Sequence, residues 1–333
     1  MISNILITEN IQGEAVGQLA AEFSVTFLPD LWKNPAKLSE MIGSFRALIV
    51  RNQTKVTAEL LSKATRLEVI GRAGVGLDNI DLDSATRAGI LVTSTPDQNA
   101  ISVAELALGM MLSLARTIPA ATDDTRQGNW NRQKFIGTEL HGKTIGIVGA
   151  GKIGFLTAQR AKSFGMRVVA YDPFISPDSI LLSELCAELV EIDELLACAD
   201  VVSSHLPATP ETIGFFNAQK FSKMKPTAFF INTSRGEVVS EEDLLQALKA
   251  GQLAGAALDV RSHEPPFKSE LETLPNVVLT PHIAAFTYEA QVRVTRAICE
   301  DVGRVLRGNT ARNPVNRPQN RRSVPRPQAE LSL

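Results

Sequence analysis

The chain has 333 residues, of which 44% are hydrophobic and 21% are charged, and its formal net charge is −2. This length suits two domains with packed cores. A charge so near zero argues against a nucleic acid or an acidic membrane as partner. The first ten residues hold no basic segment and no apolar core, so we expect no signal peptide. The longest apolar stretch, residues 104–115, is too short to span a bilayer and contains Glu105.

The three cysteines, Cys186, Cys198 and Cys299, lie far apart and form no Cys-x-x-Cys pair. Their spacing suits neither a zinc site nor a disulfide framework, so we expect no metal. Free thiols in a reducing compartment are the simplest explanation, and we expect a cytoplasmic protein.

Short β-branched runs alternate with amphipathic stretches from the start of the chain, which is typical of βαβ units around a parallel sheet. In the first third we expect strands at residues 5–8, 25–28, 47–50, 67–70 and 91–93. We expect helices between them at residues 13–22, 35–42, 57–64 and 81–88. These connections fit right-handed parallel crossovers.

A long helix is expected over residues 99–116, where Gly109 is the one residue that disfavours a helix. The segment is apolar around most of its circumference, which predicts burial against more than one surface. It is either a core helix or a helix with one face against a second copy of the chain, and the pattern leaves both open.

A second α/β series follows this helix. We expect strands at residues 144–148, 167–171, 201–204, 228–232, 255–259 and 277–280, and helices at 152–163, 240–250 and 288–306. Residues 311–333 are rich in Pro and Arg with almost no apolar side chains, so we expect a disordered tail. The second unit is inserted into the first if the helix at 288–306 returns to the first unit, which the pattern alone does not decide.

A glycine-rich turn joins the expected strand at 144–148 to the helix after it. Gly149, Gly151 and Gly154 form the pattern Gly-x-Gly-x-x-Gly. The first glycine allows a tight turn, the second lets the backbone approach a pyrophosphate, and the third lets the helix pack on the strand. The helix N-terminus attracts the anion. An ordinary tight turn is the alternative, and the strand–turn–helix context favours a dinucleotide site.

Asp172 follows the next strand, near the spacing expected for a carboxylate that binds both ribose hydroxyls. Such a carboxylate repels a 2′-phosphate, so we expect NAD rather than NADP as cofactor. The alternative is a turn-forming Asp before Pro173.

Three side chains of different chemistry, Arg235, Glu264 and His282, each follow the end of an expected strand. Ligands of parallel sheets bind at that edge. Arg can bind a carboxylate through two hydrogen bonds, His can exchange a proton near neutrality, and Glu can fix the tautomer of an imidazole. Taken singly, Arg235 also fits a helix cap or a surface ion pair, Glu264 a turn residue and His282 a satisfied loop histidine. Together they suit hydride transfer to a 2-oxo acid, which needs a carboxylate anchor and a tuned acid.

The motifs Asn-Thr-Ser-Arg-Gly, Asp-Val-x-x-x-Glu-Pro and Thr-Pro-His-Ile-Ala, after Gly-Ala-Gly-Lys-Ile-Gly, resemble the D-isomer-specific 2-hydroxyacid dehydrogenase family over roughly residues 1–308. The resemblance implies two doubly wound parallel-sheet domains. A flavodoxin-like substrate domain would comprise residues 1–98 plus 287–310, and an inserted Rossmann NAD-binding domain residues 99–286. It implies an active site in the cleft between them and a homodimer, or a tetramer, formed through the helix at 99–116.

The resemblance also implies individual roles. Arg235 binds and polarises the substrate, His282 is the acid/base, Glu264 is its partner, and Asp259 faces the nicotinamide carboxamide. The His205–Pro207 turn lies by the adenosine. Cofactor contacts are thus expected at Gly149, Gly151, Lys152, Ile153, Gly154, Asp172, Leu206, Pro207, Thr233, Asp259 and His282. The substrate carboxylate would reach the N–H groups of Val75 and Gly76, where Gly74 and Gly76 permit close approach.

Some positions depart from common members of the family. Leu106 stands where many members have His, and it cannot titrate. Residues 261–263 fill the gap of the Asp-Val-x-x-x-Glu-Pro motif, and we expect His263 to be exposed and without a role. Glu264, rather than Gln, argues against a formate dehydrogenase.

The segments VRNQTKVT, GRAGVGLDNID and YDPFIS are most similar to phosphoglycerate dehydrogenases. Arg51 is either a second cation for a phosphate or sulfonate or an ordinary surface arginine. At this length we expect no regulatory domain of the kind that many phosphoglycerate dehydrogenases carry. D-3-phosphoglycerate is therefore one candidate substrate, and hydroxypyruvate, glyoxylate and sulfolactate-type substrates stay open.

Two other functions are compatible with parts of the pattern. An NAD-sensing corepressor would bind NAD and a partner peptide with little turnover, and the three candidate catalytic residues do not exclude it. An L-specific lactate or malate dehydrogenase would place its glycine turn near the N-terminus, whereas here the turn begins at Gly149. We expect an enzyme whose partner is a small 2-hydroxy or 2-oxo acid.

Overall fold

The computed structural model describes residues 4–176, 179, 183, 184 and 186–322. The chain divides into two compact units. Unit 1 comprises the residues up to Asn99 together with those from Tyr288 onward, and unit 2 comprises residues 100–287. Each unit is a parallel sheet covered by helices, as the alternation of short apolar runs and amphipathic stretches predicts.

The sheet of unit 1 has five parallel strands in the order β2-β1-β3-β4-β5. Its strands are β1 (Ile5–Ile7), β2 (Val25–Phe27), β3 (Ala47–Val50), β4 (Val69–Arg72) and β5 (Leu91–Thr93). Its helices are α1 (Glu14–Glu22), α2 (Pro35–Met41), α3 (Ala58–Lys63), α4 (Leu82–Arg87) and α12 (Tyr288–Leu306). This order is flavodoxin-like, as expected, and it reverses between β1 and β3, where such folds bind ligands.

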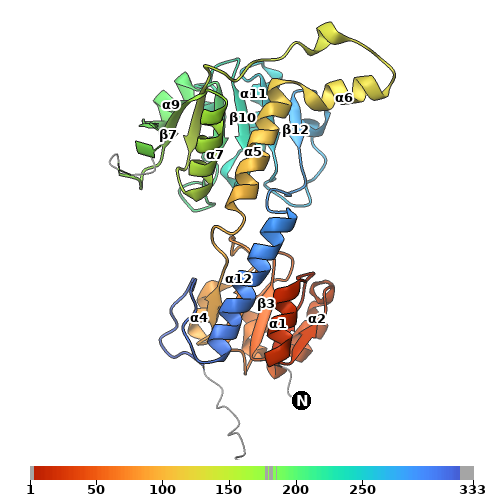
Figure 1. The fold of residues 1–333 in the computed structure, drawn as a ribbon, viewed down its shortest axis with the longest axis vertical. Coiled ribbons are helices and arrows are strands. Elements are labelled where there is room, and N and C mark those ends of the chain that lie inside the picture. Colours follow the sequence, from red (N-terminus) through yellow and green to blue (C-terminus); the bar gives the residue numbers. More distant parts are fainter. Residues whose placement is uncertain (1–3, 177–178, 180–182, 185, 323–333) are drawn as a thin grey trace, which may run out of the picture. The chain divides into compact units, whose positions relative to one another are not determined.

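The last helix, α12, belongs to unit 1. Ile298 and Val302 on α12 pack in one apolar cluster with Ile49 and Val69 of the sheet. Gly71 on β4 makes this contact possible, because a Cβ there would lie 2.6 Å from Val302 Cγ2. Figure 1 shows α12 lying along α1 and β3. The return of the final helix, which the sequence pattern left open, is therefore observed.

The segment after α12 is ordered along β5, so the prediction of a disordered tail is wrong for residues 311–322. The buried side chain of Asn316 accepts from Val92 N (2.8 Å) and donates to Ile90 O (2.9 Å). The buried Asp301 carboxylate accepts from Arg312 N and Asn313 N. The prediction failed because side chain–backbone hydrogen bonds, rather than apolar burial, hold this segment. The rest of the expected tail, residues 323–333, lies outside the described residues.

The sheet of unit 2 has seven parallel strands in the order β12-β11-β10-β9-β6-β7-β8. They are β6 (Thr144–Val148), β7 (Arg167–Tyr171), β8 (Glu188–Leu189), β9 (Val201–Ser204), β10 (Phe229–Asn232), β11 (Gly255–Leu258) and β12 (Val277–Leu279). In chain order this is the Rossmann arrangement 3-2-1-4-5-6 with one further strand at the β12 edge. The order reverses between β6 and β9, and β6 is the strand before the glycine turn.

Helices cover both faces of this sheet. The helices that the structure describes in unit 2 are α5 (Ala100–Ala115), α6 (Ile118–Arg126), α7 (Lys152–Ser163), α9 (Ile192–Cys198), α10 (Ala218–Phe221) and α11 (Glu241–Lys249), of which all but α6 lie along the sheet (Figure 1). Short 3₁₀ turns in the two units are η1 (Leu31–Lys33), η2 (Ile42–Ser44), η3 (Arg132–Phe135), η4 (Gly236–Val238) and η5 (Glu270–Thr273). Ser240 caps α11 by accepting a hydrogen bond from Asp243 N, as a Ser before an acidic first turn predicts.

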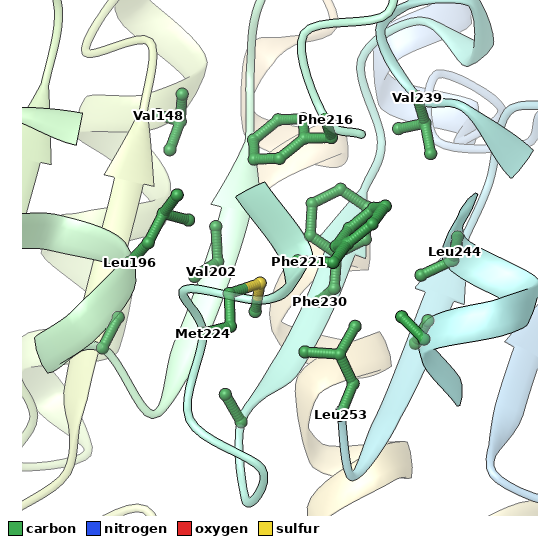
Figure 2. Close-up of a cluster of buried hydrophobic side chains, with 14 of the residues drawn as sticks. Val148, Leu196, Val202, Phe216, Phe221, Met224, Phe230, Val239, Leu244 and Leu253 are labelled. Atoms are coloured by element: carbon green, nitrogen blue, oxygen red, sulfur yellow. The ribbon is translucent and has the colours of Figure 1, made fainter. Parts of the chain in front are cut away.

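An aromatic cluster fills one face of the unit 2 sheet (Figure 2). Phe216, Phe221 and Phe230 are fully buried. The rings of Phe216 and Phe230 pack edge to face, with centroids 4.7 Å apart. Met224 and Leu253 close the cluster around them. This core fixes β9, β10 and α10 beneath the loops that carry the candidate site residues.

The long helix α5 packs against α7 and the other face of the same sheet (Figure 1). Ten of its sixteen residues are buried, which is what its nearly continuous apolar surface predicted. Ile101 and Glu105 remain exposed. Among the described residues, no single helix has the length and apolar character to cross a membrane. Helices α5 and α6 reach that length and composition only as a pair, which is bent by 63°.

Helix α6 and the segment after it, residues 117–137, extend outward from the rest of unit 2 (Figure 1). We call this segment the arm. It carries apolar side chains on its surface, with Trp130 80% and Ile136 76% exposed. The sequence pattern did not predict α6, whose polar residues outnumber its apolar ones.

Candidate active site

The glycine turn follows β6 and leads directly into α7. Gly149 adopts φ +93°, a conformation that an L side chain rarely takes. A Cβ on Gly154 would lie 2.2 Å from Gly149 O, so helix and turn approach too closely for any side chain. A Cβ on Gly151 would meet no atom within 4 Å. The turn is therefore closed on the protein side and open above Gly151, in front of the free N–H groups of the helix N-terminus.

Asp172, just after β7, holds the same turn. Its Oδ2 accepts from Ala150 N (2.9 Å), and its Oδ1 accepts from Phe174 N (2.9 Å). Each carboxylate oxygen has a second lone pair. Asp172 can therefore accept hydrogen bonds from two hydroxyl groups while it fixes the turn.

Two buried polar atoms near this edge of the sheet have no hydrogen-bond partner among the described residues, His205 Nδ1 and Thr233 Oγ1. His205 follows β9, and its Nε2 lies 3.0 Å from Ser203 Oγ. Burial lowers the pKa of His205 to about 4, so its ring is neutral at physiological pH. Because unpaired buried polar atoms are costly, they fit a site that a polar cofactor completes. The open glycine turn and these two atoms together suit a dinucleotide.

Arg235 follows β10 in a turn that the buried Asn232 organises. Asn232 Nδ2 donates to Arg235 O (2.8 Å), and Asn232 Oδ1 accepts from Ser234 N (3.0 Å). The guanidinium of Arg235 donates to Ser234 O (2.8 Å) and is half-buried. The sequence analysis identified Arg235 but missed Asn232, a polar residue at the end of an apolar strand.

Glu264 and His282 form a hydrogen-bonded pair across the loops after β11 and β12. Glu264 Oε2 and His282 Nδ1 are 2.7 Å apart. Burial alone raises the pKa of Glu264, but the hydrogen bond and charge of His282, the Arg261 N–H group and the charge of Arg235 outweigh it and hold the pKa below its usual range. Glu264 is therefore an anion near neutrality, and it favours a proton on Nδ1 of His282. The structure thus brings together the three side chains that the sequence analysis singled out.

Asp259 fixes the backbone that carries His282. It is 1% exposed, and its carboxylate accepts from Thr280 Oγ1 (2.5 Å), Ile283 N (2.8 Å) and Ala284 N (2.9 Å). His282 adopts φ +55°, which is uncommon for a residue with a side chain. Asp259 therefore stabilises an unusual backbone conformation next to the acid–base pair. Its contact with the nicotinamide carboxamide stays a prediction.

In unit 1, Arg51 begins a loop at the point where the strand order reverses. Four consecutive N–H groups of this loop, from Arg51 to Thr54, donate to the carboxylate of Glu9 at 2.8–3.2 Å. Glu9 follows β1 and is 3% exposed. Asn79 Nδ2 donates to Arg51 O and Thr54 O, which closes the loop from its other side. The sequence analysis did not identify Glu9 or Asn79.

The segment Gly74–Gly76 follows the neighbouring strand β4. Gly74 adopts φ +145°, and Thr95 N donates to its carbonyl oxygen (3.1 Å). Val75 is 41% exposed, and within the described part of the chain neither its N–H group nor that of Gly76 donates to a protein acceptor. Their predicted use as a carboxylate site fits this backbone.

Comparison with known proteins gives this arrangement a family. The model of the "D-isomer specific 2-hydroxyacid dehydrogenase, NAD binding domain" matches residues 108–284. The D-3-phosphoglycerate dehydrogenase of Synechocystis sp. is 43% identical over 317 residues, which are 95% of this chain and 56% of that protein. A crystal structure of a protein from Thermus thermophilus superposes with a TM-score of 0.88 at 35% identity, over 94% of this chain and 100% of that one. D-lactate dehydrogenase from Aquifex aeolicus, complexed with NAD and lactic acid, superposes with a TM-score of 0.81 at 31% identity, over 92% and 96% of the two chains.

Two parallel α/β units, one with an open glycine turn and an acid–base pair at its strand ends, define a nicotinamide-dependent dehydrogenase fold. The chain belongs to the D-isomer-specific 2-hydroxyacid dehydrogenase family and carries its NAD-binding domain. It spans about half the length of the curated relatives that it matches.

Proposed function

We propose that this protein is an NAD-dependent D-2-hydroxyacid dehydrogenase whose substrate is D-3-phosphoglycerate, with 3-phosphohydroxypyruvate as the oxo acid. The observation that carries the proposal is the Glu264–His282 pair at 2.7 Å, beside Arg235 and on the same edge of the sheet as the glycine turn. These side chains supply the cation, the acid–base group and the anionic partner that hydride exchange with a 2-oxo acid requires.

The proposed chemistry divides among these side chains. Bound NADH supplies the hydride for reduction of the oxo acid. Arg235 binds the substrate carboxylate and polarises the neighbouring carbonyl. His282 donates a proton from Nε2 to the oxygen at C2, while its Nδ1–H group stays hydrogen-bonded to Glu264. In the direction of oxidation, His282 Nε2 accepts the hydroxyl proton. Glu264 stabilises the imidazolium and keeps the ring in one orientation.

The cofactor contacts remain those expected from the sequence. We propose that the turn from Gly149 to Gly154 and the α7 N-terminus bind the pyrophosphate, and that Asp172 binds the ribose hydroxyls. Thr233 and the segment Leu206–Pro207 contact the cofactor beside them, and Asp259 meets the nicotinamide. The carboxylate of Asp172 disfavours NADP through repulsion of its 2′-phosphate.

In unit 1, we propose that Arg51 binds the substrate phosphate and that the N–H groups of Val75 and Gly76 bind its carboxylate. Burial lowers the pKa of Arg51, and the negative charge of Glu9 opposes this shift only in part. The guanidinium still stays cationic at physiological pH, because the ordinary pKa of arginine is so high. A partly desolvated guanidinium binds a dianionic phosphate strongly. Phosphoglycerate dehydrogenases among the relatives support this choice.

A panel of 2-oxo acids with NADH and NADPH tests the proposal. Loss of NADH absorbance is followed with 3-phosphohydroxypyruvate, hydroxypyruvate, glyoxylate, pyruvate and sulfopyruvate. We expect the highest kcat/KM with 3-phosphohydroxypyruvate and NADH. A higher kcat/KM with glyoxylate or hydroxypyruvate would show that 3-phosphohydroxypyruvate is not the preferred substrate, but the protein would still be a D-2-hydroxyacid dehydrogenase. No turnover with any acid, together with tight NADH binding, would favour the corepressor-like function.

We propose further that the protein acts in the cytoplasm as a homodimer. The free thiols Cys186, Cys198 and Cys299 suit a reducing compartment. Exposed apolar side chains on α5 and the arm, namely Ile101, Trp130 and Ile136, suit burial against a second copy. Sedimentation equilibrium tests this, with an expected mass of about twice 36.0 kDa. A mass of one chain would contradict the dimer, and a mass of four would indicate a tetramer.

A further inference from the structure

The loop between Asp259 and Glu264 contains a buried arginine that the proposed chemistry does not use. The side chain of Arg261 is 7% exposed. Its Nε and Nη2 donate to Glu241 Oε2 at 3.1 and 2.7 Å, and its Nη1 donates to Glu272 Oε1 at 2.6 Å. Glu241 is the first residue of α11, and Glu272 lies in η5. The guanidinium therefore ties the loop to two separate elements of unit 2.

The backbone of the same residue contacts the candidate site directly. Arg261 N donates to Glu264 Oε1 (3.2 Å), while Glu264 Oε2 pairs with His282. Ser262 N donates to Glu241 Oε1 (2.7 Å). On the other side lies Gly236, where a Cβ would come 2.0 Å from Arg261 C and O. The peptide after Arg261 is thus confined between Glu241 and the residue that follows Arg235.

We propose that Arg261 is a positioning residue for the acid–base pair, because its ion pairs with Glu241 and Glu272 fix the backbone N–H group that holds Glu264 against His282. This inference rests on the proposed function, in which the pair transfers the substrate proton. The side chain of Glu264 is 37% exposed, so packing alone does not fix its carboxylate. Its orientation depends on two hydrogen bonds, one to each oxygen, and Arg261 supplies the donor of one.

A purely structural role is the alternative, since a buried arginine between two carboxylates also contributes to folding. The two roles differ in what they do to His282. A structural role affects unfolding only. A positioning role changes the tautomer of the His282 ring, because Glu264 is the acceptor that favours Nδ1–H over Nε2–H.

The test compares Arg261→Met and Arg261→Lys with Arg46→Met in the full-length chain. Arg46 makes the matched control, because it forms a largely buried ion pair with Glu68 within unit 1, whereas the candidate acid–base pair belongs to unit 2. Two readouts are taken. Long-range ¹H–¹⁵N spectra at about pH 9, where an ordinary imidazole is neutral, report the tautomer of each of the four histidines, and His282→Asn assigns the signal of His282. Steady-state kinetics report kcat and the KM for NADH.

We expect Nδ1–H at His282 in the wild type and in Arg46→Met. In Arg261→Met we expect a shift toward Nε2–H and a loss in kcat of roughly ten- to a hundredfold, the scale of a misplaced catalytic group, with the KM for NADH unchanged. Arg261→Lys keeps the charge without the forked geometry and should give a partial shift. A His282 signal in Arg261→Met identical to that of the wild type would overturn the proposal.

Glu272→Gln provides a second test if Arg261→Met does not fold. This variant removes one of the two ion pairs and keeps the other, so we expect a smaller tautomer shift of the same sign. An unchanged tautomer in folded Glu272→Gln, at a reduced free energy of unfolding, would count against positioning. Because the spectra need no turnover, a wild type that shows Nδ1–H at His282 but reduces no oxo acid would refute the proposed function and leave the role of Arg261 intact.

Discussion

Each unit fixes a loop of its candidate site with one buried carboxylate at the end of a strand. In unit 1, Glu9 accepts four consecutive backbone N–H groups from residues 51–54. In unit 2, Asp259 accepts two backbone N–H groups and one hydroxyl from the segment that contains His282. Both acidic side chains are buried. In both units, therefore, a buried carboxylate orders a loop by accepting hydrogen bonds from its backbone N–H groups.

The two loops differ in what they leave available. Glu9 uses the N–H groups of its loop. In the proposed function that loop therefore acts through the side chain of Arg51, and the N–H groups of Val75 and Gly76 bind the substrate carboxylate. Asp259 holds a histidine in an unusual conformation next to Glu264. Disturbing unit 1 should therefore weaken substrate binding, whereas disturbing unit 2 should slow the chemical step.

The largest effect is expected from Asp259→Asn. The amide places an N–H donor opposite one of the donors that Asp259 now accepts, so the backbone at His282 loses its support. We expect kcat to fall by about a hundredfold or more, the scale of a lost acid–base group. Steady-state kinetics and circular dichroism check this. A folded variant with kcat within about twofold of the wild type would contradict the role of Asp259.

Glu9→Gln should give a smaller effect of a different kind. Its amide N–H₂ group cannot accept the N–H groups now bound by one oxygen, which costs about 1–3 kcal/mol of unfolding free energy. We expect the KM for the oxo acid to rise about tenfold, equivalent to about 1.4 kcal/mol, with kcat nearly unchanged. Glu59→Gln on the exposed surface of unit 1 is the control. A variant that loses kcat at constant KM would remove the contrast between the units.

Asn316→Ala separates stability from the site within unit 1. The change leaves the buried groups Val92 N and Ile90 O without their partner, so we expect a loss of about 1–3 kcal/mol in urea unfolding. Asn313→Ala, which keeps the hydrogen bond from its own backbone N–H group to Asp301, should cost much less. Neither variant should alter kcat or KM. Equal stability of the two variants would show that the ordered segment does not depend on Asn316.

The smallest effect is expected for the loss of stability at low pH, which depends on protonation of Glu272 in unit 2. Burial alone raises the pKa of Glu272, but hydrogen bonds from Arg261 and Ser269 outweigh it and lower the pKa from 4.5 to about 2. A lowered pKa contributes stability that is fully present above 4.5 and is lost as the pH falls toward 2. Glu272→Gln should therefore lose less stability than the wild type between about pH 5 and about pH 2. If the urea midpoints of the wild type and of Glu272→Gln fell by equal amounts over this pH range, the lowered pKa assigned to Glu272 would be contradicted.

The fold was largely predictable because local patterns agreed with one another. Apolar β-branched runs and capped amphipathic stretches predicted the central strands and long helices, and the turn around Gly149 predicted the cofactor edge. Strand ends were displaced where the apolar run and the paired segment differ. The strand expected at residues 67–70 is observed as β4 (Val69–Arg72), because apolar Leu67 precedes the paired segment and pairing continues through Gly71 and Arg72.

Much of the supporting structure was not predictable. Glu9, Asp301 and Asn316 act through hydrogen bonds to backbone groups far away in sequence, and no periodic pattern marks such contacts. Arg261 illustrates the same limit, because its partners Glu241 and Glu272 meet it only after folding. The sequence shows which polar residue stands at the end of a strand and so indicates a site. It does not show the hydrogen-bond partner of that residue, because the tertiary structure decides which groups meet.

A single-turnover experiment tests the central claim most directly. Enzyme with bound NADH is mixed with 3-phosphohydroxypyruvate, and the loss of NADH absorbance and the configuration of the product are measured for the wild type and for His282→Asn. The account predicts D-3-phosphoglycerate from the wild type and a rate about a hundredfold or more lower in the variant. An equal rate in both proteins, or an L-configured product, would contradict it.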